Sequence, residues 1–179
     1  MKIRAPLNRT LTLTDTEAEL YGSQLGCLSA PAAVDDIVNS ILNQDLLAVL
    51  PFLPASFVDL LILDPPYNLT KTFNGTRFSG RSMDEYEEWM TSWFPQVLHT
   101  LTPTASVYIC GDWRSSAAIH RIAEQHLTVR NRITWEREKG RGATANWKNC
   151  SEDIWFCTVS NNYTFNLDAV KLRRRVIAP

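Results

Sequence analysis

A short aliphatic run near the middle of the chain ends in an acid, two prolines and a tyrosine. The run is Val58–Leu63, and Asp64, Pro65, Pro66 and Tyr67 follow it. Each proline fixes its own φ and keeps the preceding residue out of the helical region, so the carbonyls of Asp64 and Pro65 should be free acceptors. A carboxylate beside such a carbonyl can accept both hydrogens of an exocyclic amine, and a tyrosine ring can stack on a planar base. These four residues therefore predict a catalytic site for an amino-purine or amino-pyrimidine, although such a turn could also simply end a strand.

The elements around this turn predict how it is held. Val58–Leu63 and residues 105–110 have the composition of buried strands, and a capping box at Ser82–Glu85 opens a helix with an aromatic stripe that should pack in the core. Pro95 should kink or break that helix. A second helix is expected over residues 113–126. This alternation favours an α/β fold with a largely parallel sheet, in which ligands lie beyond the carboxyl ends of strands.

The remaining segments give weaker signals. Towards the N-terminus we expect an arm over residues 1–14, a short helix from near Asp15, a linker at 29–33, a strand at 37–42 and a short helix at 46–50. After the motif we expect an irregular loop at 70–81 and strands at 132–136 and 153–159, with 163–166 as a hairpin partner of the last strand. Gly140-Arg141-Gly142 should lie in a flexible polar loop. It is a weak phosphate signature, because no strand ends directly before it and no helix opens after it.

The Asp-Pro-Pro-Tyr run and its surroundings resemble the DNA adenine-N6 methyltransferases that use S-adenosylmethionine and place their catalytic block first in the chain. The similarity runs from about Ile37 to Lys171 and includes Asn43-Gln44-Asp45, the Trp-rich helix, and the runs 149–156 and 163–170. It implies a Rossmann-like S-adenosylmethionine-dependent methyltransferase core, α/β, with a mostly parallel sheet and an antiparallel hairpin. Residues 1–34 would be an N-terminal arm with a short helix, and residues 35–179 a partial, incomplete catalytic domain.

The resemblance also implies a reaction. Asp64 and the Pro65 carbonyl would bind the N6 amine of an adenine flipped out of double-stranded DNA, and Tyr67 would stack on the base. Asp45, with Leu46 beside it, and Asp64 would contact the S-adenosylmethionine cofactor. Asp45 could instead only cap the helix it precedes, and the two roles are compatible.

DNA contacts are expected from the loop after the motif and from a basic segment further along. The net charge is −1, but six basic residues fall within nineteen positions between Arg130 and Lys148. Charge position matters more than the total for binding phosphates. The candidate DNA-binding residues are Asn68, Lys71, Arg77, Arg81, Lys139 and Arg141, although a merely solvated loop would have a similar composition.

One departure from the family limits these expectations. Its members carry a Phe-x-Gly-x-Gly loop for the methionine part of the cofactor, and this chain has none. We expect that a second polypeptide supplies the glycine-rich loop and target recognition, or that the chain is truncated, or that it is part of a longer protein. A non-catalytic DNA-binding relic or subunit is the main alternative function. Methylation of cytosine N4 is a weaker hypothesis, because relatives that act on cytosine usually carry serine in place of Asp64. Methylation of RNA is also a weaker hypothesis, because no glycine-rich loop precedes the motif.

Composition excludes several other classes. The 179 residues suffice for one domain with a substantial core, and 45% apolar with 21% charged residues is a globular composition. The sequence shows neither a membrane span nor a signal peptide, which favours a cytoplasmic protein. The spacing of the four cysteines implies no metal site, and Cys110 and Cys157 should behave as small buried hydrophobes.

Overall fold

The computed structural model describes residues 12–73, 76–141, 144–145 and 147–171. The chain forms two compact units, Met1–Pro54 and Ala55–Pro179. The sequence predicted that the methyltransferase-like part begins after residue 34. The division into these two units does not test that boundary, which stays a prediction.

A four-stranded sheet organises the second unit. Its strands are β1 (Val58–Leu63), β4 (Leu101–Gly111), β5 (Thr128–Arg141) and β6 (Asn149–Thr158), in the order β1-β4-β6-β5. The β1–β4 pairing is parallel, and the β4–β6 and β5–β6 pairings are antiparallel. The α/β expectation is confirmed, but the expected mostly parallel sheet is not observed among the described strands. β6 is inserted between β4 and β5 and runs antiparallel to both, so only the β1–β4 pairing is parallel.

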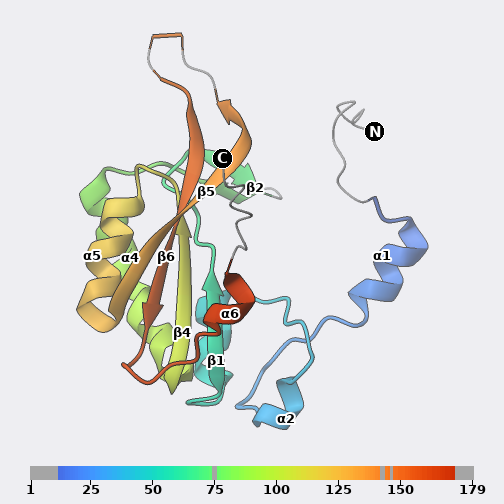
Figure 1. Ribbon diagram of the computed structural model, residues 1–179. Helices are drawn as coiled ribbons and strands as arrows, with labels where there is room; N and C mark the ends of the chain where they lie inside the picture. Colours follow the sequence, from blue (N-terminus) through green and yellow to red (C-terminus); the bar gives the residue numbers. More distant parts are fainter. Residues whose placement is uncertain (1–11, 74–75, 142–143, 146, 172–179) are drawn as a thin grey trace, which may run out of the picture. The chain divides into compact units, whose positions relative to one another are not determined.

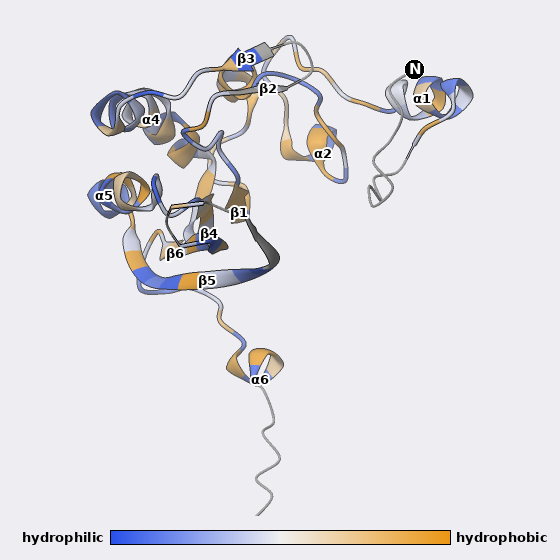
Figure 2. Ribbon diagram, turned by 90° about the horizontal axis from the view of Figure 1, so that it is seen from above, coloured by the Kyte–Doolittle hydropathy of each residue, from blue (hydrophilic) through white to orange (hydrophobic). Residues whose placement is uncertain are grey.

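Two helices cover one face of this sheet (Figures 1 and 2). The helix α4 (Met83–Val97) begins with the expected capping box, in which Glu85 N–H donates to Ser82 Oγ at 3.2 Å. Its side chains Tyr86, Met90 and Phe94 are fully buried, so the aromatic stripe packs in the core as expected. The helix continues through Pro95 for two residues and then tightens into the 3₁₀ turn η2 (Leu98–Thr100).

The second covering helix, α5 (Ser116–His126), follows β4 closely. Ser115 accounts for the short connection, because its N–H and its hydroxyl both donate to the Asp112 carboxylate, at 2.9 and 2.6 Å. Ile119 and Ile122 turn their side chains into the core. The expected strand–helix–strand alternation in the middle of the chain is thereby confirmed.

Three predictions for the second unit were wrong. Residues 70–81 are not an irregular loop, because β2 (Lys71–Phe73) and β3 (Thr76–Phe78) pair there as an antiparallel hairpin. The partner of β6 is β5, whereas Tyr163 and Phe165 form no strand and pack their rings on Phe156, at 5.8 and 6.0 Å between centroids. Gly140 and Arg141 belong to β5 and not to a loop, while Gly142 lies outside the described residues. The short helix α6 (Leu167–Val170) follows.

The first unit consists of short helices joined by turns. They are α1 (Asp15–Gly22), α2 (Val34–Ile37), α3 (Leu46–Val49) and η1 (Leu50–Phe52). The helices near Asp15 and Leu46 were predicted, but the strand at 37–42 was wrong. Asn39 has φ of 57°, a left-handed conformation that interrupts an extended run, and Leu42 forms only an isolated bridge with Gly26.

Candidate active site

Asp64 lies at the carboxyl end of β1, where the strand leaves the sheet. The register pairs Leu63 with Ile109 of β4, so Asp64 comes level with Cys110 at the edge of the sheet. Asp64 is exposed, whereas Pro65 directly after it is buried. The motif therefore presents its carboxylate to solvent from a turn anchored by a buried ring.

The carbonyl groups of the two prolines differ in their partners. The hydroxyl of Tyr86, from α4, donates to the Pro66 carbonyl at 3.1 Å. The Pro65 carbonyl accepts no hydrogen bond from any residue that the structure describes. The sequence predicted a free carbonyl at Pro65, and the structure agrees; it made no such prediction for Pro66.

Tyr67 is half-buried beside this carboxylate. Burial raises the pKa of its hydroxyl, and the charges of Asp64, Glu152 and Cys110 raise it further, as does its hydrogen bond to Asp64. Each of these effects disfavours the phenolate. The Tyr67 hydroxyl is therefore protonated at neutral pH and serves as a donor.

Two further residues belong to this edge. The sequence predicted Cys110 only as a small buried hydrophobe and gave Glu152 no role in the site. Cys110 is half-buried, and its thiol pKa is raised by burial and then by the charges of Asp64 and Glu152. Glu152 forms an ion pair with Arg137 of β5. Cys110 follows Ile109, the register partner of Leu63, and Glu152 precedes Asp153, the partner of Gly111. Only these strand pairings bring the residues together, so no local sequence signal could have found them.

The β5–β6 hairpin extends past this edge. Gly111, the last residue of β4, pairs with Asp153, and the hairpin continues outward from Thr134 and Asp153 (Figure 1). Trp135 pairs with Glu152 and is 60% exposed. The extension places an aromatic ring and the Arg137–Glu152 pair above the end of β4.

The candidate DNA-binding residues divide into two groups. Arg77 and Arg81 are exposed, and Asn68 is half-buried with its amide bonded to the backbone of Arg81. The side chains of the other three, Lys71, Lys139 and Arg141, lie outside the part that the structure describes, although their backbones belong to β2 and β5. These positions do not test whether any of the six residues contacts DNA.

Asp45 and Leu46, the remaining candidate cofactor residues, belong to the first unit. Asp45 caps α3, and Leu47 N–H and Ala48 N–H both donate to its Oδ1, at 3.0 and 3.1 Å. Within the described residues Oδ2 has no hydrogen-bond partner, and the neighbouring Leu46 is 39% exposed. The preceding Gln44 is fixed by its amide, which exchanges two 2.9 Å hydrogen bonds with the backbone of Leu28. The capping role is thus present, and one carboxylate oxygen is open to a ligand.

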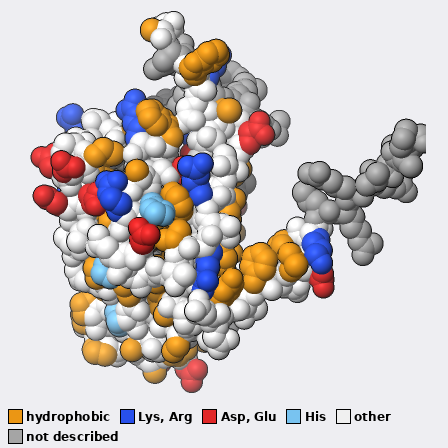
Figure 3. Space-filling view, turned by 60° about the vertical axis from the view of Figure 1, so that its left-hand side comes forward, with side chains coloured by type: hydrophobic (Ala, Val, Ile, Leu, Met, Phe, Trp, Pro, Cys, Tyr) orange, Lys and Arg blue, Asp and Glu red, His pale blue; other side chains and the backbone are white. Residues whose placement is uncertain are grey.

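Two shallow cavities lie away from the motif. One of about 520 Å³ is lined by α4 residues including Asp84, Glu87 and Glu88, and one of about 430 Å³ lies between α5 and the strands β5 and β6. Figure 3 shows acidic and basic side chains interspersed on the side of the protein that carries these helices. Neither of these two cavities includes Asp64 or Tyr67.

The described residues contain no group of three His, Cys, Asp or Glu side chains placed to hold a metal ion. None of their helices is long and apolar enough to cross a membrane.

Comparison with known proteins identifies a family that the chain matches. A family model described as DNA methylase, of the N6/N4 type, matches residues 58–175. The chain is 31% identical over 121 residues to the type II methyltransferase M.HpaI of Haemophilus parainfluenzae, covering 66% of this chain and 38% of that protein. It is 29% identical over 147 residues to the DNA adenine methyltransferase YhdJ of Escherichia coli K12, covering 81% and 49%. The chain therefore spans less than half the length of these two relatives.

A solved structure shares the fold. The PvuII DNA methyltransferase, named as cytosine-N4-specific, superposes with a TM-score of 0.60 at 14% identity and covers 73% of this chain and 52% of that one. At this identity the likeness shows the fold alone, and it confirms the α/β core expected from the sequence. Nothing in the comparisons supports a second polypeptide.

Proposed function

The chain belongs to the N6/N4 family of DNA methylases, and from this premise we propose that it is the catalytic portion of an enzyme that methylates the N6 amine of adenine in DNA. The observation that carries the proposal is the pairing of an exposed Asp64 carboxylate with the unbonded Pro65 carbonyl at the end of a strand. The names of the relatives, among them an adenine methyltransferase, favour adenine over cytosine. The family match itself covers both amines.

The two acceptors suit an amine that must become a nucleophile. The nitrogen of an adenine amine is a poor nucleophile because its lone pair is delocalised into the ring. Hydrogen bonds from its two hydrogens to Asp64 and to the Pro65 carbonyl favour a tetrahedral nitrogen with an exposed lone pair. The nitrogen then forms a bond to the donor methyl carbon as the carbon–sulfur bond breaks, and its surplus proton is lost to Asp64 or to solvent. No covalent enzyme intermediate is required.

Tyr67 and the rigid turn would hold the base during this step. A base within a duplex must be flipped out to reach Asp64, at a cost of a few kcal/mol, and stacking on the Tyr67 ring offsets part of that cost. Pro65 and Pro66 restrict the backbone between the two residues. Because the Tyr67 hydroxyl keeps its proton, it can donate to the Asp64 side chain beside it.

The proposed methyl donor is S-adenosylmethionine, whose sulfonium supplies an electrophilic methyl group when it is bound. In the first unit the residues that would hold it are Asp45, through its open Oδ2, and the exposed Leu46 beside it. A carboxylate oxygen suits the amine and hydroxyl donors of an adenosine group, and an exposed leucine suits its planar face. Asp64 is the remaining candidate, from the second unit.

The wider setting follows from the same proposal. Double-stranded DNA is the substrate, and Arg77 and Arg81 are the described candidates for contacts with its phosphates. We place the enzyme in the cytoplasm and, because relatives are named type II methyltransferases, in DNA modification of the restriction–modification kind. A second polypeptide that completes the cofactor site stays a prediction.

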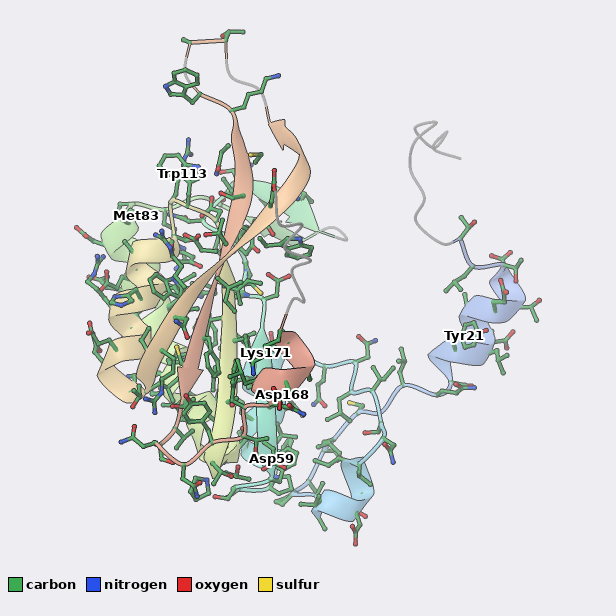
Figure 4. All side chains as sticks on the ribbon, in the orientation of Figure 1. Tyr21, Asp59, Met83, Trp113, Asp168 and Lys171 are labelled. Carbon is green, nitrogen blue, oxygen red and sulfur yellow. The ribbon has the colours of Figure 1, made fainter. Side chains whose placement is uncertain are left out.

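The test is a methylation assay of the 179-residue chain with duplex DNA and labelled S-adenosylmethionine. The expected product is N6-methyladenine, and nucleoside analysis separates it from N4-methylcytosine. Asp64→Ala should abolish the product while DNA binding stays within about twofold of wild type. Asp59→Ala is the matched control, since Asp59 lies at the other end of the same strand and accepts a 2.9 Å hydrogen bond from Thr102 (Figure 4).

Two results would contradict the proposal. Full activity of Asp64→Ala would remove the motif from the chemistry. A wild-type chain that binds DNA but neither binds S-adenosylmethionine nor methylates, even when every candidate partner polypeptide is present, would favour the non-catalytic alternative.

A further inference from the structure

Asn68 follows the Asp64–Tyr67 turn directly, and its side chain is bonded to residue 81. Its Nδ2 donates to the Arg81 carbonyl at 2.7 Å, and Arg81 N–H donates to its Oδ1 at 2.7 Å. One step further along the segment, Gly80 N–H donates to Thr70 Oγ1 at 3.0 Å. We call the reciprocal Asn68–Arg81 pair the Asn68 clamp.

The clamped residue carries a cation whose position is also fixed. The Arg81 guanidinium lies 5.6 Å from the centroid of the Phe78 ring and 5.5 Å from that of Trp89. These two rings meet edge to face at 5.5 Å. An arginine held against aromatic faces keeps its N–H groups available at the rim of the plane, where they can donate to an anion.

One acid near Arg81 is Glu85, at the start of α4. The Glu85 carboxylate accepts hydrogen bonds from Ser82, which lower its pKa most, and the Arg81 charge lowers it further. Within the part of the chain that the structure describes, no ion pair joins Arg81 to an acid. The guanidinium can therefore bind an external anion.

From this arrangement we infer that Asn68 is a positioning residue for DNA, which acts through Arg81 and does not itself touch the base. One covalent bond separates Asn68 from Tyr67, and two hydrogen bonds join it to Arg81. A phosphate bound by Arg81 is thereby held at a fixed distance from Asp64 and Tyr67, which sets where the target nucleotide enters the site. The inference rests on the proposed function.

The chemistry of the clamp explains why asparagine stands here. The pair needs one acceptor and one donor at the same distance from the backbone of residue 68, and the amide of asparagine supplies both. Aspartate would keep the acceptor but would place a charge against the Arg81 carbonyl, and serine is too short for both bonds. Exposed hydrogen bonds of this kind contribute little net stability, so their main effect is on geometry.

The test measures binding of a fluorescent DNA duplex to the full chain by anisotropy, over a range of salt concentrations. Arg81→Ala should weaken binding about tenfold and lower the salt slope by about one, as expected for one lost phosphate contact. Asn68→Ala should weaken binding by about threefold to tenfold and shift the salt slope in the same direction. The double variant should bind no more than about twofold worse than Arg81→Ala, because Asn68 acts only through Arg81.

Controls separate positioning from general damage. Asn131→Ala changes an exposed asparagine on β5 and should bind as wild type. Thr70→Val removes only the neighbouring Gly80 bond and should leave the salt slope unchanged. Thermal melting checks that each variant folds, and Asn68→Ser serves as a second clamp variant if Asn68→Ala does not.

Each result decides the inference. Additive losses in the double variant would show that Asn68 contacts DNA by itself, and a clamp variant with wild-type affinity would show that it only closes a turn. Either outcome would contradict the inferred positioning role of Asn68 without contradicting the proposed function. Failure of the wild-type chain to bind the duplex would instead contradict the proposed function.

Discussion

Tyr86 is fully buried in α4, and its hydroxyl donates a 3.1 Å hydrogen bond to the carbonyl of Pro66, twenty positions earlier in the chain. Burial raises the pKa of this hydroxyl, and the charge of Asp112 adds to the effect, although a hydrogen bond with Ser115 lowers it. The helix therefore supports the motif through a neutral donor. A strand end that carries two prolines and few backbone donors is fixed in this way from the core.

Tyr86→Phe should loosen the motif without disturbing the helix. The change removes the donor to Pro66 and leaves the ring in place, so we expect the free energy of unfolding to fall by about 1 kcal/mol. Urea denaturation measures this loss. Methylation should fall more than DNA binding, because the turn that carries Asp64 loses its support. Equal stability of the variant and the wild type would show that water replaces the hydroxyl.

Gly111→Ala should destabilise the end of β4 through one contact. A Cβ at this position would lie 2.4 Å from Cδ1 of Ile119, which is fully buried and has no room to move away. Overpacking of this kind costs about 1–3 kcal/mol. Ile119→Val removes the clashing methyl group, so the double variant should recover part of the loss. A double variant that shows purely additive destabilisation would contradict the proposed clash.

The buried thiol of Cys157 should make the free energy of unfolding depend on pH in the alkaline range. The side chain is fully buried, and burial raises the pKa of its thiol to about 12 from an ordinary value of about 9. Below pH 9 the thiol is neutral in both states. Between pH 9 and 12 only the unfolded chain loses this proton, so stability falls as pH rises, by about 1.4 kcal/mol per pH unit at most.

Denaturation curves at pH 8, 9 and 10.5 test this effect against Cys157→Ala. The alanine variant should be less stable throughout, because it leaves a small cavity, but its stability should fall less steeply with pH. Other alkaline groups titrate in both proteins, so the difference between the two slopes isolates the thiol. Parallel slopes would show that Cys157 is not the group responsible.

The sequence predicted the parts of this fold that local signals determine. The capping box at Ser82, the helical spacing of Tyr86, Met90 and Phe94, and the aliphatic run ending at Asp64 each depend on a few neighbouring residues. Asp64 was therefore placed at a strand end before the fold was known. The same holds for the capping role of Asp45, because a cap needs only the three residues after it.

The parts that were missed depend on residues far apart in the chain. β5 continues past Glu136 through charged residues that have no apolar alternation, and its pairing with β6 is found at Glu136 with Ser151 and again at Arg141 with Asn149. Cys110 and Glu152 join the site only through the register of β1, β4 and β6. The bonds of Asn68 to Arg81 depend on how the twelve intervening residues fold, so its place after the motif could not predict them.

Asp45→Ser separates the two roles proposed for Asp45, since serine is also a favourable N-cap but lacks a carboxylate. Hydrogen exchange of the Leu47 and Ala48 amides should stay protected in this variant and lose protection in Asp45→Ala, which has no cap. If Oδ2 contacts the cofactor, calorimetry should show S-adenosylmethionine binding about tenfold weaker in Asp45→Ser, the loss expected for one hydrogen bond to a charged group. Wild-type affinity in a variant with an intact cap would leave Asp45 with the capping role alone.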